Sequence, residues 1–71
     1  MPEGEGDLAV AARHVARAKV IVARQRRLIA RLETAGCATG DAEKTLRLFL
    51  DCLEIFQDQE RALRGNRESA R

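Results

Sequence analysis

The sequence predicts an all-α protein: a two-helix antiparallel hairpin that dimerises into a four-helix bundle. Apolar residues recur at heptad spacing in the first half of the chain, and a second apolar series follows a short glycine-containing break. The 71 residues include one Pro, no Trp and no Tyr, and 34% are charged, which is typical of long amphipathic helices. A chain this short hides a small share of its surface when it folds alone, so its length favours a partner.

The first helix is predicted over about residues 8–35. Residues 1–6 are acidic and rich in glycine, which predicts a flexible tail. Asp7 is the expected N-cap of the first helix, and the hairpin as a whole is predicted over residues 7–64. Gly36 stands where helices commonly end in a left-handed conformation. The core-facing heptad positions are Leu8, Val15, Val22 and Ile29 in one register and Ala11, Ala18, Gln25 and Leu32 in the other.

The second helix is predicted over about residues 40–64. Thr39 is favoured over Asp41 as its N-cap, because Asp41 and Glu43 then lie in the first turn, where acidic residues suit the helix dipole. Gly65 and Asn66 are stop signals, so residues 65–71 are expected to form a frayed polar end. Cys37 lies in the break and Cys52 well into the second helix, too far apart for a disulfide within one chain.

The second helix indicates that the hairpin needs a partner. Its apolar residues cover well over half of its circumference, more than one antiparallel neighbour can bury. We therefore expect a homodimer, with a helix of another protein as the alternative partner. The predicted oligomer interface comprises Leu46, Leu48, Phe49, Cys52, Leu53, Ile55, Phe56, Leu63, Val15, Val22, Gln25, Ile29 and Leu32.

Gln25 is the one polar residue at a predicted core position of the first helix. Two interpretations of it remain open. It pairs across an interface and determines the register, as a buried Asn does in coiled coils, or it lies at the edge of the seam. We predict that Gln25→Leu raises thermal stability, and a clear loss of stability would count against the seam-edge interpretation.

The net charge of +2 conceals an uneven distribution. The first helix has seven basic residues against Glu33 alone, whereas the second has six acidic residues and an acidic balance. Complementary charge favours antiparallel pairing of unlike helices. The alternative function is a nucleic-acid-associated regulator that uses an anion-binding face. The absence of aromatic stacking residues and of a helix-turn-helix turn counts against it. Its candidate residues are Arg17, Arg24, Arg27 and Arg31.

No residue pattern in the chain specifies a reaction, so the protein is not expected to be an enzyme. His14 is the only histidine; a minor hypothesis makes it the acceptor in phosphotransfer, and the simpler one makes it a boundary residue of the apolar stripe. One His and two separated Cys lack the paired spacing of a zinc site, and no cofactor is predicted. The acidic start resembles no signal peptide and no apolar run is long enough for a bilayer, so a cytoplasmic location is expected, without membrane binding.

Several short motifs are similar to a known group of sequences. They are the segment from His14 to Ala16, the segment from Ala23 to Glu33 with its Gln-Arg-x-x-Ile-x-x-Leu-Glu pattern written around Gln25, then Gly36, Thr39, Ala42-Glu43 and Leu46-x-x-Phe49. Over about residues 13–63 the chain resembles small uncharacterised helical proteins of alphaproteobacteria. The resemblance implies a bacterial cytoplasmic origin and brings no activity with it.

Overall fold

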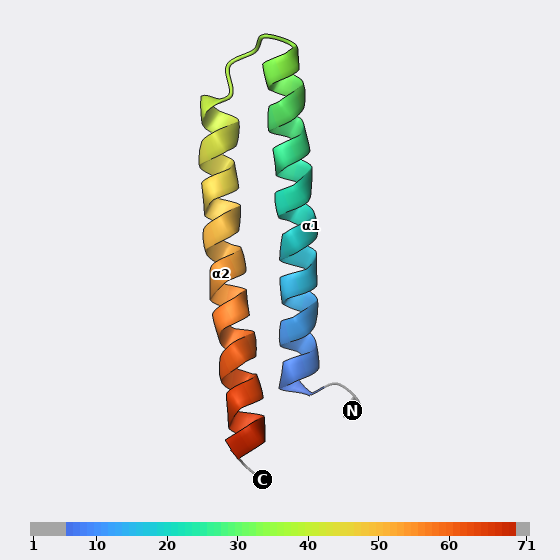
Figure 1. The fold of residues 1–71 in the computed structure, drawn as a ribbon, viewed down its shortest axis with the longest axis vertical. Coiled ribbons are helices and arrows are strands. Elements are labelled where there is room, and N and C mark those ends of the chain that lie inside the picture. Colours follow the sequence, from blue (N-terminus) through green and yellow to red (C-terminus); the bar gives the residue numbers. More distant parts are fainter. Residues whose placement is uncertain (1–5, 70–71) are drawn as a thin grey trace.

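The computed structural model describes the backbone of residues 6–69 and the side chains of residues 6–66. α1 spans Asp7–Thr34 and α2 spans Gly40–Ser69. The two helices pack side by side in antiparallel directions and are joined by a short loop at one end (Figure 1). The predicted all-α hairpin is confirmed, and the described residues contain no strand.

The N-terminus of α1 differs by one residue from the prediction. Gly6, in an extended conformation, is the N-cap, and its carbonyl accepts the first helical hydrogen bond, from the Val10 N–H at 3.2 Å. Asp7 is therefore not the N-cap but lies in the first turn, where its negative charge suits the helix dipole. Of the predicted flexible tail, residues 1–5 lie outside the described part of the chain.

α1 ends as the glycine predicts, in a Schellman motif. Gly36 has φ +75°, the left-handed conformation that glycine adopts without a steric penalty. The Cys37 N–H donates to the Leu32 carbonyl at 2.8 Å, and the Gly36 N–H donates to the Glu33 carbonyl at 3.0 Å. These two bonds satisfy carbonyls that the helix end leaves unpaired. They also turn the chain back toward α2.

α2 begins directly after Thr39, as predicted. The Thr39 carbonyl accepts the first helical bond, from the Glu43 N–H at 2.8 Å. The Thr39 hydroxyl does not accept from the backbone; it donates to the Glu43 carboxylate at 2.7 Å. Asp41 and Glu43 lie in the first turn, next to the positive end of the helix dipole.

The predicted end of α2 is wrong. The helix continues through Gly65 and Asn66 to Ser69, so residues 65–69 are helical rather than frayed, and residues 70–71 lie outside the described part. Gly36 is the only described glycine with positive φ, so Gly65 does not adopt a helix-ending conformation. Glycine inside a helix costs about 1 kcal/mol relative to alanine, which is a penalty and not a stop. Ion pairs of Arg61 with Asp58 and of Arg64 with Glu60, each 3.0 Å long, support the turns before it.

The core is a single seam between the helices. Its buried residues are Ala11, Val15, Ala18 and Val22, all on α1 and all small. They are four of the eight predicted heptad positions of that helix, and the other four are half-buried. No described side chain is less than 2% exposed, and no described residue of α2 is buried. The molecule measures 55 × 23 × 14 Å. The two helices form a single layer, so both broad faces of the hairpin are open (Figure 1).

Candidate interaction surface

A hydrogen bond from the Gln25 side chain joins the two helices. The Gln25 Nε2 donates to the Ala42 carbonyl at 2.8 Å, in a partly buried position. Ala42 lies inside α2, so its carbonyl is also the acceptor for the helical N–H four residues later. Gln25 therefore adds a second donor to an oxygen that is already satisfied. Within the chain, Gln25 thus has a partner across the seam, and its role in determining the register stays a prediction.

One broad face of the hairpin has an apolar groove between the helices. Its volume is about 360 Å³. Ala18 and Ile21 of α1 and Phe49 and Phe56 of α2 supply its apolar walls. The groove exists because the seam residue Ala18 is too small to fill the space between the two phenylalanines. The complete lining is His14, Arg17, Ala18, Ile21, Phe49, Cys52 and Phe56.

His14 contacts the aromatic wall of this groove. The centroids of its ring and the Phe56 ring are 5.2 Å apart, and the ring planes are inclined by 53°. That separation and tilt are within the range of favourable aromatic pairs. His14 remains exposed to solvent on its other side. The contact gives the histidine a structural role at the boundary of the apolar stripe.

The predicted oligomer interface divides into three groups by burial. Val15 and Val22 are buried in the seam of one chain and offer little surface to another molecule. Gln25, Ile29, Leu32 and the α2 residues Leu46, Phe49, Leu53, Phe56 and Leu63 are half-buried. Leu48 and Ile55 are 64% and 56% exposed, and Cys52 between them is exposed as well.

The exposed residues Leu48, Cys52 and Ile55 are called the apolar trio below. They are spaced at four and three residues, so they share one face of α2. Cys52 lines the groove, which places the trio on the same open face as the groove. Ile21 and Leu28 extend that face onto α1, and Leu28 is 37% exposed. Their recurrence at seven residues was the sequence signal for this extension.

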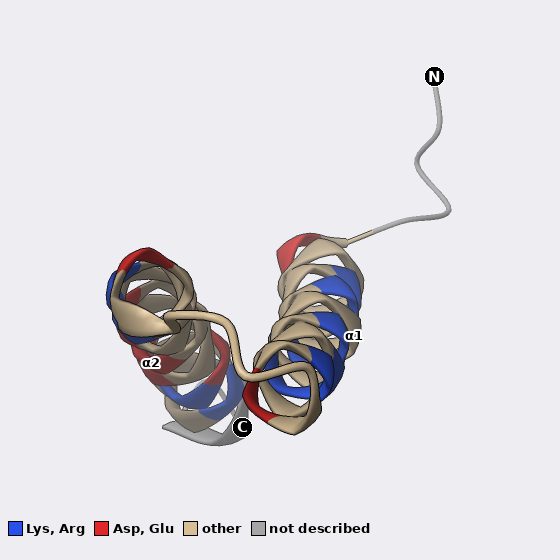
Figure 2. Ribbon diagram, turned by 90° about the horizontal axis from the view of Figure 1, so that it is seen from above, with Lys and Arg blue, Asp and Glu red and all other residues tan. Residues whose placement is uncertain are grey.

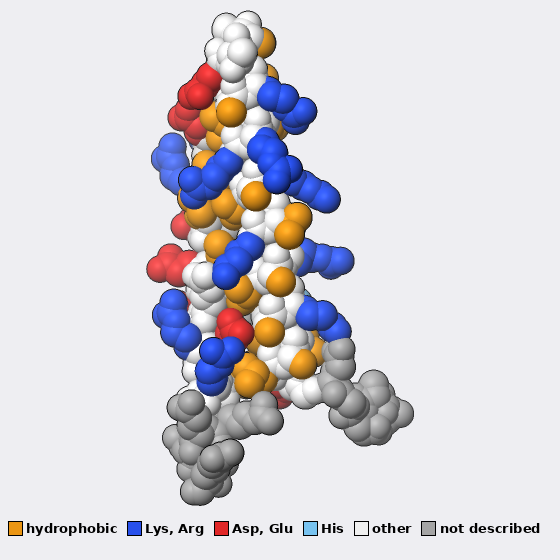
Figure 3. Space-filling view, turned by 45° about the vertical axis from the view of Figure 1, so that its right-hand side comes forward, with side chains coloured by type: hydrophobic (Ala, Val, Ile, Leu, Met, Phe, Trp, Pro, Cys, Tyr) orange, Lys and Arg blue, Asp and Glu red, His pale blue; other side chains and the backbone are white. Residues whose placement is uncertain are grey.

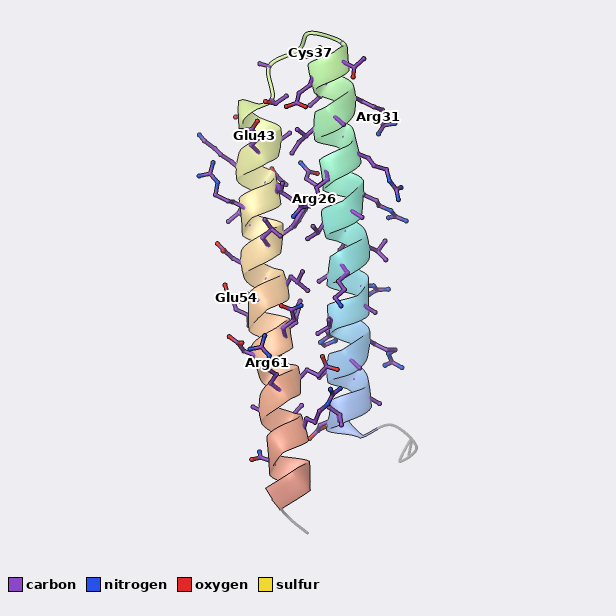
Figure 4. The ribbon with its side chains drawn as sticks, in the orientation of Figure 1. Arg26, Arg31, Cys37, Glu43, Glu54 and Arg61 are labelled. Carbon is purple, nitrogen blue, oxygen red and sulfur yellow. The ribbon has the colours of Figure 1, made fainter. Side chains whose placement is uncertain are left out.

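The arginines lie along the outer side of α1. Lys and Arg gather on the side of this helix that faces away from α2 (Figure 2). Arg24, Arg27 and Arg31 line a shallow hollow together with Ala30, and Arg31 extends away from α2 (Figure 4). Neither these three nor Arg17 forms an ion pair with any residue that the structure describes. The four candidate residues of the anion-binding face therefore lie on one side of α1, in two neighbouring hollows that share Arg24.

An exposed valine interrupts this basic surface. Val20 is 51% exposed and lines a second hollow with Arg17 and Arg24. Hydrophobic side chains are visible between the basic ones on this side of the molecule (Figure 3). Residue type alone did not indicate that Val20 lies outside the seam. Its spacing of two residues from the buried Val22 was the available signal.

The remaining reactive groups are dispersed. Cys37 and Cys52 are both free and exposed, one in the loop and one on α2. No three His, Cys, Asp or Glu side chains among residues 6–66 are placed to hold a metal ion together. Neither described helix has the length and apolar character needed to cross a bilayer.

Comparison with known proteins identifies no relative. No protein-family model, curated protein or solved structure matches the chain. The proposals below are therefore based on the geometry of this molecule.

Proposed function

We propose that the chain is a non-catalytic, homo-oligomeric helical module with an interaction or regulatory role, and that its basic unit is a dimer forming a four-helix bundle. One observation supports this more than any other: the apolar trio is exposed beside an apolar groove on an open face. A second hairpin placed on this face removes both features from water. The partner is taken to be a second copy because complementary charges are already present in one chain.

The thin seam supports the same proposal. Among residues 6–66 the four buried residues are alanines and valines, while the larger apolar side chains are at most half-buried. Full burial of one Leu, Ile or Phe side chain contributes about 1.5–3 kcal/mol. Small helical domains commonly obtain this stabilisation by oligomerisation. In a symmetric dimer each interface residue is buried once in each copy, so its contribution counts twice. A few side chains are therefore sufficient for a stable dimer.

Solution mass over a hundredfold range of concentration tests the dimer. One chain has a mass of 7.9 kDa. At micromolar concentration, light scattering is expected to give twice this mass. A cooperatively melting helical monomer contradicts the proposal. A loosely folded monomer also contradicts it, and indicates that a helix of another protein covers the groove.

A matched pair of variants locates the interface. Ile55→Gln and Val20→Gln each remove a β-branched residue of similar exposure, 56% and 51%, but only Ile55 belongs to the open face. We expect Ile55→Gln to raise the dissociation constant of the dimer about 100-fold, since two isoleucines are lost from each dimer. Val20→Gln is expected to leave the dissociation constant of the dimer within about threefold of the wild-type value. Equal effects of the two variants contradict this location.

A second candidate function is nucleic-acid association through the basic face of α1. The observation that favours it is the row of exposed arginines without ion-pair partners in the described part of the chain, three of which share one hollow. Arginines in such a row contact phosphates and release counterions, so binding weakens with salt. The acidic residues at the start of α2 oppose it, because they lie beside the part of α1 that carries these arginines.

Retention on DNA at increasing salt separates this candidate from the first. Arg27→Gln combined with Arg31→Gln is expected to reduce the slope of log K against log salt by about two. Arg61→Gln is the matched control, because Arg61 lies on α2, is exposed and is already paired with Asp58 of the same helix. An unchanged slope in the double variant, or no retention of the wild type at low salt, contradicts nucleic-acid binding.

The non-catalytic part of the proposal extends to His14. Its ring contact with Phe56 accounts for a histidine at this position without any reaction. His14→Gln is therefore expected to leave the dimer intact. Transfer of phosphate to wild-type His14 from any phosphorylated response regulator contradicts the structural role.

A further inference from the structure

The apolar groove is large enough for a small molecule. Its volume of about 360 Å³ lies within the range of small-molecule sites, about 300–1,000 Å³. A second copy stacked on the open face covers this groove whichever way its helices run. The groove then becomes a closed space between the helices of a bundle, which is a common location for bound ligands.

One cationic side chain lies at the edge of this groove. Arg17 is exposed, lines the groove from α1 and forms no ion pair with any residue that the structure describes. It is the only Lys or Arg among the seven described residues of the lining, which include no Asp or Glu. Arg17 also lines the hollow that contains Val20, so it lies between the open face and the basic surface. The groove thus combines apolar walls with one unbalanced positive charge.

His14 adds a second polar group beside this charge. It precedes Arg17 by three residues, so the two side chains share one face of α1, and both line the groove. Apart from its contact with the Phe56 ring, His14 has no hydrogen-bond or ion-pair partner in the described part of the chain. An imidazole nitrogen can therefore donate a hydrogen bond to an oxygen that the Arg17 guanidinium already holds.

The polar group that fits this pair is a carboxylate. The planar fork of an arginine matches the two carboxylate oxygens, and the two hydrogen bonds are strengthened by the charge. The single charge of Arg17 also matches a carboxylate better than a phosphate monoester, which carries about −1.5 to −2 charges at pH 7. Arg24, the next arginine on this side of α1, is not part of the groove lining.

The space for the rest of the ligand lies between two aromatic rings. Phe49 and Phe56 are seven residues apart on α2, which is about 10 Å along the helix. Ala18 lies opposite them and leaves the space between them open. The walls of this space are apolar, so the body of the ligand is expected to be apolar as well.

We propose that the groove binds an apolar monocarboxylate, one molecule per chain, with its body between Phe49 and Phe56 and its carboxylate on Arg17. This inference rests on the proposed homodimer and adds a ligand to the same face. The second copy encloses the apolar body, whereas Arg17, at the edge of the face, keeps the carboxylate in contact with water. Because the ligand is enclosed only in the dimer, its binding stabilises the dimer.

Octanoate and octanol are suitable probes, because they have alkyl chains of equal length and differ in the head group. Arg17→Gln is expected to weaken octanoate binding about tenfold, the loss of a charge-assisted hydrogen bond, and octanol binding by less than about twofold. Arg31→Gln is the matched control, because Arg31 is exposed, has no ion-pair partner among the described residues and lines a different hollow. It is expected to leave the binding of both probes unchanged. Equal effects of the two variants overturn the carboxylate site.

NMR titration measures these affinities and locates the probe. Octanoate is expected to shift the methyl signals of Ile21, which lines the groove. Leu50 provides the control signal, because it lies two positions after Leu48 and hence on the opposite side of α2. Equal shifts at Ile21 and Leu50 overturn the assignment of the ligand to the groove.

Solution mass with and without octanoate separates this inference from the dimer on which it rests. Octanoate at about ten times its dissociation constant is expected to lower the dissociation constant of the dimer at least about tenfold. A dimer that binds no octanoate overturns the ligand site and leaves the dimer standing. The mass of a single chain, whether or not octanoate is present, overturns the proposed dimer and the enclosed site with it.

Discussion

The Gln25 side chain donates a 2.8 Å hydrogen bond to the backbone carbonyl of Ala42, and this bond joins the middle of α1 to the first turn of α2. The bond links a side chain of one helix to the backbone of the other, across 17 positions of the sequence. The donor comes from a position where the heptad pattern expects an apolar residue. A partly buried polar group at such a position specifies the register more than it stabilises the fold.

Substitution of Gln25 separates stability from register. Gln25→Ala is expected to lower the free energy of unfolding by about 1 kcal/mol, the net value of a typical hydrogen bond. Gln25→Glu is expected to lower it further, because a carboxylate cannot donate to the Ala42 carbonyl. Gln25→Leu is expected to raise the melting temperature, since the Ala42 carbonyl keeps its helical donor. Thermal unfolding of all three variants tests this. Equal losses of stability in Gln25→Leu and Gln25→Ala contradict it.

Two glycines have opposite roles, which a pair of alanine variants reveals. Gly36→Ala is expected to destabilise the hairpin by about 1 kcal/mol or more, because Gly36 has φ +75°. Gly65→Ala is expected to stabilise it by up to about 1 kcal/mol, because Gly65 is inside α2 and open space surrounds the position of its missing Cβ. Chemical denaturation measures both. A loss of stability in Gly65→Ala contradicts a helix that continues to Ser69.

Two valines test the position of the seam. Val22 is 7% exposed and Val20 is 51% exposed, although they are two residues apart on α1. Val22→Ala is expected to cost about 1–3 kcal/mol, the combined loss of transfer free energy and packing. Val20→Ala is expected to change stability by less than about 0.5 kcal/mol, and in the stabilising direction because alanine is the better helix former. Similar losses in both variants contradict the assigned seam.

The ring contact between His14 and Phe56 predicts a modest coupling. His14→Ala and Phe56→Leu are each expected to reduce stability, and the double variant is expected to lose about 0.5–1.5 kcal/mol less than the sum of the two. The double-mutant cycle is measured by chemical denaturation. Simple additivity contradicts an energetic contact between the rings.

Hydrophobic periodicity was sufficient to predict the hairpin and the inward face of α1, and the glycine itself predicted the turn at Gly36. These features depend on local rules: a helix buries residues spaced at three and four, and only glycine adopts positive φ without a penalty. The end of α2 was not predictable in this way. Gly65 and Gly36 are the same residue type, and whether a glycine ends a helix depends on the backbone around it rather than on the glycine alone.

By itself, the sequence determined the fold class, the two helices and the heptad positions that form the seam, because each of these follows from the spacing of apolar residues along one chain. Only the tertiary structure decided what the apolar surplus of α2 does. It showed that Phe49 and Phe56 turn toward α1 and line a groove with Ala18, while Leu48 and Ile55 stay exposed. The physical reason is that burial depends on the rotation of each helix about its axis and on the size of the residues opposite. Neither quantity can be obtained from one helix alone.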